Sequence, residues 1–147
     1  MTPDEAANVI TNYYFAPMRG ERWNITPEQF AQAAQSHWPD CSTRLIEDDS
    51  GTAQRTRFAM TFKNGTERSG EYSLRSGLIL SGYAALDAAE FVSWFLTLLD
   101  PEVSILFNNQ EAIERGDYDD HVLPRAMGLR PMAEALATHL AGAIGDD

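Results

Sequence analysis

The chain lacks the residues on which several common functional sites depend. Cys41 is its only cysteine, so no intramolecular disulfide, CxxC motif or thiolate zinc cluster can form. It has no GxGxxG or GxxxxGK[ST] sequence for a nucleotide, no GxSxG elbow and no HExxH pair. Cys41 also has no neighbouring residue that would activate its thiol. We therefore expect no catalytic residue, no cofactor and no metal, and a single cysteine fits a reducing cytoplasm.

The chain also lacks a long apolar run and an excess of positive charge. Its longest apolar stretch, around residues 91–99, is far short of the roughly 20 residues that span a bilayer. The start, MTPDEAANVI, has no basic region leading into an apolar run, so we expect no secretory signal. The net charge of −11 repels nucleic-acid phosphates and anionic lipid surfaces. We expect a cytoplasmic protein that binds neither nucleic acid nor a membrane.

The acidic residues that are present are unevenly distributed. Residues 1–50 hold eight acidic against three basic side chains, residues 101–147 hold nine against three, and residues 51–100 hold five of each. A neutral central part therefore lies between two acidic flanks. This distribution favours a basic partner, although acidity that only maintains solubility explains it equally well.

Helix-start signals mark much of the rest of the chain. With 147 residues, 44% of them hydrophobic, the chain has the material for one packed domain over residues 1–147. Thr2 and Thr26 each precede a proline, and each has Glu or Gln three residues later, which is a capping box. The first box predicts a helix that reaches Tyr13, and the second a helix that Pro39 stops. Asp87 should cap a third helix, apolar on most sides and therefore buried. A fourth is predicted over residues 131 to about 144.

Between the second and third expected helices the hydrophobic period changes from 3.6 to 2, as the alternation in TRFAMTF shows. Asn64-Gly65 marks a turn, and a three-residue loop that includes Lys63 places Tyr72 and Leu74 on the phenylalanine face. A two-residue loop would place charged residues there instead, so we predict the longer loop. The longer loop also sets Arg57 opposite Glu71.

A second three-residue loop, Arg75-Ser76-Gly77, would pair Leu74 with Leu78 and continue the meander. The predicted fold class is α+β, with an antiparallel sheet of about five strands and helices packed on one face. The expected strands are near residues 43–47, 55–63, 66–74, 78–82 and 103–107.

Two acidic loops, ERGDYDDHVLP (114–124) and IEDDSG (46–51), are the candidate sites. The first has oxygen and nitrogen ligands for a divalent cation, but its spacing is not that of an EF-hand and no second histidine follows at helical spacing. Solvation explains most such clusters, while Tyr118 among the charges favours contact with a protein. His37 and His139, on or beside apolar helical stripes, are interpreted as packing residues. The candidate partner-binding residues are Glu47, Asp48, Asp49, Asp117, Tyr118, Asp119 and Asp120.

The segment AALDAAEFVSWFLTLLDPEVSILFNN is an apolar helix followed by a strand, after a short meander. It resembles the architecture of small acidic bacterial immunity proteins of polymorphic toxin systems. The resemblance covers about residues 55–110, includes no diagnostic motif and carries over no functional residue. It implies a protein that holds a cognate, basic toxin domain inactive by occluding its active site or substrate path. Complementary charge would speed association, and a few aromatic anchors would supply most of the affinity.

Two alternatives from other classes remain open. The first is a small-ligand-binding or enzymatic α+β domain with a pocket between sheet and helices. Such a pocket needs polar groups on the apolar face, where the Tyr72 hydroxyl is the chief one available. The second is a subunit that dimerises through an exposed strand edge.

Overall fold

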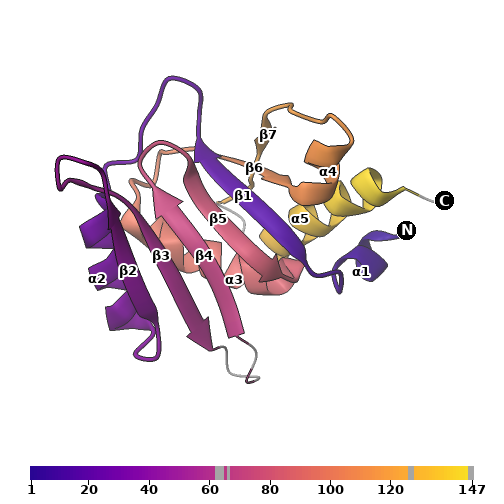
Figure 1. Ribbon diagram of the computed structural model, residues 1–147. Coiled ribbons are helices and arrows are strands. Elements are labelled where there is room, and N and C mark those ends of the chain that lie inside the picture. The colour runs from indigo at the N-terminus through magenta and orange to yellow at the C-terminus, as the bar shows by residue number, and fades with distance from the viewer. Residues whose placement is uncertain (62–64, 66, 126–127, 146–147) are drawn as a thin grey trace.

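The sheet is the centre of the computed structural model, which describes residues 1–61, 65, 67–125 and 128–145. Its seven strands are all antiparallel and lie in the order β2-β3-β4-β5-β1-β6-β7 (Figure 1). The α+β class is confirmed, but the sheet has seven strands and not about five. The strands are β1 (Thr11–Pro17), β2 (Ser42–Glu47), β3 (Ala53–Thr61), β4 (Glu67–Ser73), β5 (Gly77–Tyr83), β6 (Ile105–Asn109) and β7 (His121–Val122).

Strands β3 and β4 have the register that the apolar pattern predicts. Thr61 pairs with Glu67, as the three-residue loop requires, while the loop residues 62–64 lie outside the described residues. Arg57 lies opposite Glu71, with 3.2 Å between Nε and Oε1, and Tyr72 is fully buried. Leu74 is 42% exposed, so its predicted place in the core is wrong. The reason is that β4 ends one residue before it.

The pairing of β4 with β5 differs from its prediction by two residues, because the loop comprises residues 74–76 and not 75–77. Ser73 pairs with Gly77 and Tyr72 with Leu78, so the predicted pairing of Leu74 with Leu78 is wrong. The Ser73 hydroxyl accepts a hydrogen bond from the Ser76 amide (2.7 Å), which closes the turn earlier than expected. A shift of two residues keeps each side chain on its face, and Leu78 is still fully buried.

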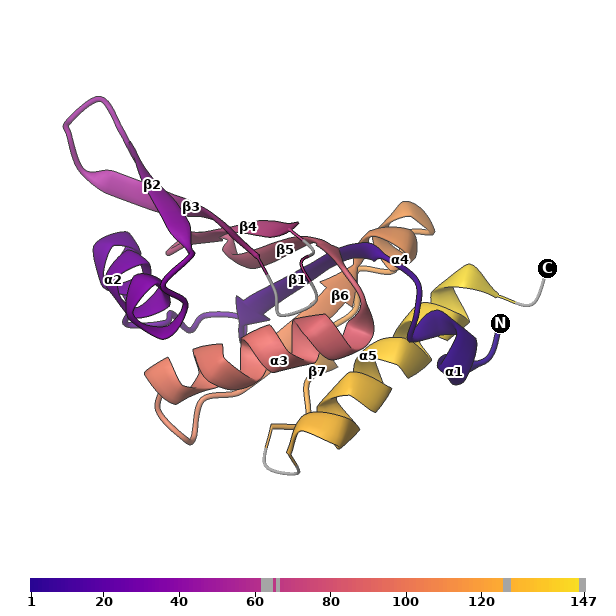
Figure 2. The same cartoon turned by 90° about the horizontal axis from the view of Figure 1, so that it is seen from below.

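Three helices cover one face of the sheet, as Figure 2 shows. Their apolar sides pack on the sheet and on one another, and α1 packs on α5. No helix in the described residues is long and apolar enough to cross a membrane. The three are α2 (Pro27–His37), α3 (Ala85–Phe95) and α5 (Leu129–Ile144), and the shorter helices are α1 (Pro3–Ala6), α4 (Gln110–Glu114) and a 3₁₀ turn, η1 (Leu96–Leu98).

Two predicted helix boundaries are wrong. The helix from Thr2 does begin with its capping box, but it ends at Ala6, and Tyr13 lies in β1 at the centre of the sheet. Buried and partly exposed residues alternate from Thr11 to Phe15, which is the period of a strand. Asp87 does not cap α3, because the chain enters the helix directly after β5 and Asp87 forms an ion pair with Arg68 (3.5 Å) instead.

Candidate functional site

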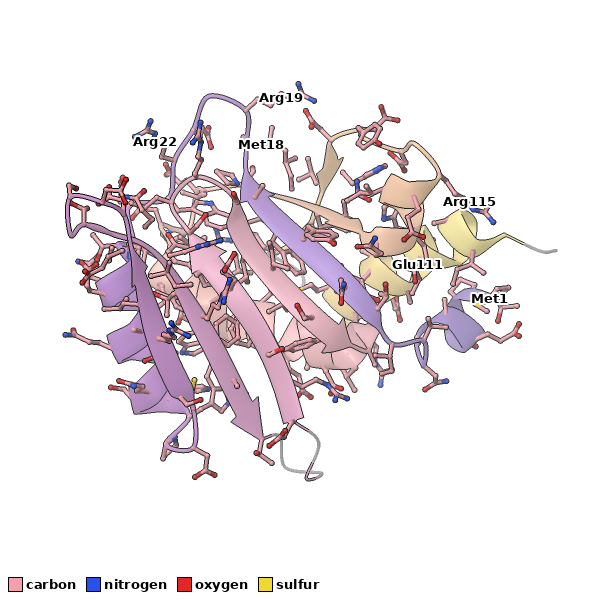
Figure 3. All side chains as sticks on the ribbon, viewed as in Figure 1. Met1, Met18, Arg19, Arg22, Glu111 and Arg115 are labelled. Carbon is pink, nitrogen blue, oxygen red and sulfur yellow. The ribbon has the colours of Figure 1, made fainter. Side chains whose placement is uncertain are left out.

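The acidic loop that follows α4 is attached to its surroundings at its start and near its middle. Asn108 in β6 donates from Nδ2 to the carbonyl oxygen of Asp117 (2.9 Å). Arg115 donates to the carbonyl oxygen of Ile144 (2.6 Å), which joins the start of the loop to the end of α5, and Figure 3 shows Arg115 beside that helix. The backbone of the loop is therefore held by both the sheet and the last helix.

Asp117 lies at the centre of a cluster with two of the chain's three histidines. His121 Nε2 is 3.0 Å from both carboxylate oxygens, and His139 Nε2 is 3.2 Å from Oδ2. The amide of Asp119 donates to Oδ1 (3.0 Å). The hydrogen bond from His121, followed by those from Asp119 and His139, holds the pKa of the Asp117 carboxyl well below its usual range. Asp117 is thus a charged carboxylate that the protein itself already engages.

Asn109 sets the tautomer of His139. Its Oδ1 caps α4 by accepting from the Ala112 amide (2.8 Å), so the other end of its side chain must be the amide nitrogen. That nitrogen is 3.2 Å from His139 Nδ1, and because it can only donate, Nδ1 accepts. The proton of the neutral ring is therefore on Nε2, from where it is donated to Asp117.

The other residues of the loop face outward. Tyr118 is 69% exposed, and Val122, on the edge strand β7, is 55% exposed. Asp119 is exposed, and Asp120 forms an exposed ion pair with Arg19 (2.9 Å). In Figure 3 Arg19 lies on the connection after β1 and extends toward this loop. An aromatic ring and an edge strand are thus presented together at the surface.

The second acidic loop lies at the opposite edge of the sheet. Glu47 ends β2, which is one edge strand, whereas the first loop leads into β7, which is the other (Figure 1). Six strand spacings of about 4.8 Å separate the two edges by about 29 Å. The predicted partner-binding residues therefore form two separate groups, with Glu47, Asp48 and Asp49 in one and residues 117–120 in the other.

Asp48 organises its own loop. Its carboxylate accepts from the Ser50 hydroxyl (2.6 Å), from the Thr52 amide (3.0 Å) and from Gln54 Nε2 (3.0 Å). These bonds lower the pKa of Asp48, and the bond from the Ser50 hydroxyl has the largest effect. The pKa of Asp48 is lower in the folded protein than in the unfolded chain, where it is about 3.9. The charged carboxylate therefore stabilises the fold above about pH 3.9, and this stabilisation is lost as the pH falls through the pKa of the folded state.

The Ser50→Ala substitution is expected to raise the pKa of Asp48 toward its ordinary value, because it removes the hydroxyl that donates to the charged form. A carboxyl-carbon NMR titration from pH 7 to pH 2 measures this. Thr97→Ala, in which the removed hydroxyl donates to the Trp94 carbonyl on another element, is the control and should leave the titration unchanged. An Asp48 midpoint that is the same in Ser50→Ala and in the unsubstituted protein would contradict this assignment.

The chief polar group on the inner face of the sheet is occupied. The Tyr72 hydroxyl donates to the carbonyl oxygen of Ile25 (2.7 Å), and stacked rings such as Phe30, whose centroid is 4.8 Å from that of Tyr72, fill the adjoining space. One hollow, lined by Leu86, Leu129 and Ala133, lies among α1, α3 and α5, and another lies where Pro27 and Glu28 of α2 meet Leu45 of β2.

Sequence reasoning missed His139 and Asn109. In the sequence His139 adjoins Leu136 and Leu140, which favours a packing role, and its long separation from Asp117 leaves no local signal of their contact. Asn109 had a weak signal, as an N-cap residue type directly after a predicted strand.

A search against protein-family models, curated proteins and solved structures found no match for this chain.

Proposed function

We propose that the protein is an immunity-type binding protein that neutralises or docks onto a basic partner protein, such as a cognate toxin domain. The observation that carries the proposal is the position of Tyr118, a large aromatic side chain that is 69% exposed on an acidic loop. Exposed tyrosines of this kind are enriched among the residues that dominate the energy of protein interfaces.

The loop that bears Tyr118 is fixed before any partner arrives. Asp117, the residue before it, is bonded through its side chain to His121 and His139 and through its carbonyl to Asn108. Binding through a loop that is already ordered loses less conformational entropy than binding through a mobile one. The hydrogen bonds around Asp117 therefore support affinity even though they direct its carboxylate inward.

The acidic groups contribute mainly to the rate of association. Asp119 and Asp120 are exposed beside Tyr118, whereas Glu47, Asp48 and Asp49 lie at the other edge of the sheet, and the two edge strands are about 29 Å apart. Exposed charges attract an oppositely charged partner over a distance near the Debye length, about 8–10 Å at physiological salt. We therefore assign both the contact and most of the steering to residues 117–122, because the distant loop lies several Debye lengths away and its charges are largely screened there.

Tyr118→Ala is expected to weaken the complex with a basic domain encoded by the neighbouring gene by about 30-fold or more, the scale of a hot-spot residue. Isothermal titration calorimetry with the two purified proteins measures the dissociation constant. The matched control is Leu86→Ala, which removes another large apolar side chain, 50% exposed, from the remote helix α3 and should leave affinity unchanged. Equal losses in the two variants, or no binding by the unsubstituted protein, would refute the proposal.

A further inference from the structure

We infer that Asp117, His121 and His139 form a binding site for one divalent transition-metal ion, and that Zn²⁺ is the ion best suited to it. The inference does not rest on the proposed protein partner. The three side chains come from the acidic loop, from β7 and from α5, and each offers one ligand atom. These atoms all lie within 4.8 Å of one another.

Two of the three separations between ligand atoms are close to those around a small metal ion, and the third, between the two histidine nitrogens, is at most 4.8 Å. A tetrahedral Zn²⁺ at about 2.0–2.1 Å from each ligand keeps its ligand atoms about 3.3 Å apart. The two histidine nitrogens lie 3.0 Å and 3.2 Å from the nearest oxygens of Asp117. An ion can therefore enter between them with small movements of the side chains, while the three residues stay on their own elements.

The ligand types decide which ion fits. Two imidazole nitrogens and one carboxylate suit Zn²⁺ and its neighbours among the transition metals, whereas Ca²⁺ and Mg²⁺ prefer oxygen ligands alone. Three protein ligands leave the fourth position of a tetrahedral ion for water, and the partly exposed His121 and Asp117 give solvent access to it. The amide of Asp119 donates to Asp117 Oδ1 and orients the carboxylate from outside the ligand set.

The same distances also fit hydrogen bonds without a metal ion. The position of the proton on the His139 ring distinguishes the metal-free cluster from the metal-bound one. Without metal, the His139 proton is on Nε2, because Nδ1 accepts from Asn109. An ion bound at Nε2 needs the lone pair of that nitrogen, so the ring must carry its proton on Nδ1. The ring stays neutral, because the proton changes position and is not lost. That proton would face the Asn109 amide nitrogen, so the amide must turn and give up its cap on α4. Loss of one cap lowers affinity only about fivefold to tenfold, which is small beside the affinity of a zinc site.

The first test is a titration of the full chain, freed of metal with EDTA, with Zn²⁺ alone. We expect one equivalent to bind, and the midpoint of thermal unfolding to rise by about 5–10 °C at a free Zn²⁺ concentration 100 times the dissociation constant. Mg²⁺ and Ca²⁺ should give no shift. His121→Ala and Asp117→Asn should each weaken Zn²⁺ binding by about 100-fold or more. The matched control is His37→Ala, which removes the third histidine, at the end of α2, and should leave the Zn²⁺ affinity and the shift caused by Zn²⁺ unchanged.

The second test keeps all three proposed ligands, and its NMR measurement uses the unsubstituted protein, so that measurement does not depend on a variant that folds. Histidine nitrogen NMR of the unsubstituted protein should show the His139 proton on Nε2 before Zn²⁺ and on Nδ1 after it. Asn109→Asp should raise Zn²⁺ affinity about tenfold, because a carboxylate caps α4 and accepts from Nδ1 together. The inference would be overturned by any of three results: no saturable Zn²⁺ binding, full binding in both His121→Ala and Asp117→Asn, or an unchanged His139 tautomer. The three residues would then be joined by hydrogen bonds alone.

Discussion

Phe30→Ala is expected to lower the free energy of unfolding by about 3–5 kcal/mol, the usual cost of removing a buried aromatic ring. Phe30 has no exposed surface and lies between α2, the sheet and α3. Its centroid is 4.8 Å from that of Tyr72, 5.4 Å from that of Phe58 and 6.0 Å from that of Phe95. The rings come from three other elements, so the cavity cannot close by moving one of them. Urea unfolding followed by tryptophan fluorescence measures the loss.

Two further substitutions on α2 separate packing from helix formation. Phe30→Leu keeps most of the apolar volume and should cost clearly less than Phe30→Ala. Gln32→Ala alters an exposed position of the same helix and should stay within about 0.5 kcal/mol of the unsubstituted protein. A loss below about 1 kcal/mol for Phe30→Ala would show that the aromatic cluster does not hold the helix on the sheet.

The two capping boxes show what local sequence can predict. Thr2 and Thr26 both accept a hydrogen bond from the backbone amide three residues later, as the sequence predicts. Only the second helix continues, because Phe30 and Ala34 bury a complete stripe on the sheet. A capping box thus predicts where a helix begins, while tertiary packing decides how far it extends.

Strand pairing was predictable only where it is local. The β3–β4 register followed from one turn and an alternating pattern, because a slip of one residue would bury the charged side chains. Strand β1 pairs instead with β5 and β6, with Tyr13 opposite both Leu80 and Asn109. No turn connects these strands, so the sequence contained no signal for a pairing across 67 or 96 residues.

The candidate site was likewise predictable only where its features are local in the sequence. The acidic loop and Tyr118 could be identified from a short stretch of sequence, because charge and exposure are local properties. His139 reaches Asp117 only because α5 returns to β6, and the tautomer depends further on the cap of α4. The two acidic loops also look alike in sequence, yet the strand order places them at opposite edges of the sheet.

The two proposals share Asp117 and can fail separately. Zn²⁺ would replace the hydrogen bonds from His121 and His139 with bonds to one ion, and would attach the loop of Tyr118 more firmly to α5. If Zn²⁺ does not bind, those hydrogen bonds still order the loop for a partner. If no partner binds, the metal titration is unaffected, since it uses the isolated chain.

Gly77→Ala is expected to lower the free energy of unfolding by about 2–5 kcal/mol, from two causes that act at the same position. Gly77 has φ +83°, a left-handed conformation that side chains disfavour. A Cβ atom there would also lie 2.2 Å from the carbonyl oxygen of Phe15 and 3.1 Å from the Cα of Ala16, both in the backbone of β1. Backbone cannot rotate away as a side chain can, so β5 must move from β1 at the centre of the sheet. Urea unfolding measures the loss.

Gly82→Ala separates the two causes, because both glycines lie in β5 and have similar positive φ values. Gly82 has φ +77°, but the nearest atom to its added Cβ is Ile10 Cγ2 at 4.0 Å, an ordinary contact. Its expected loss is therefore the conformational cost alone, about 1–2 kcal/mol. The difference between the two variants measures the close approach of β5 to β1. Equal losses would mean that the strands separate freely at Gly77, and that the centre of the sheet is less tightly packed than its fully buried residues Phe15 and Leu78 indicate.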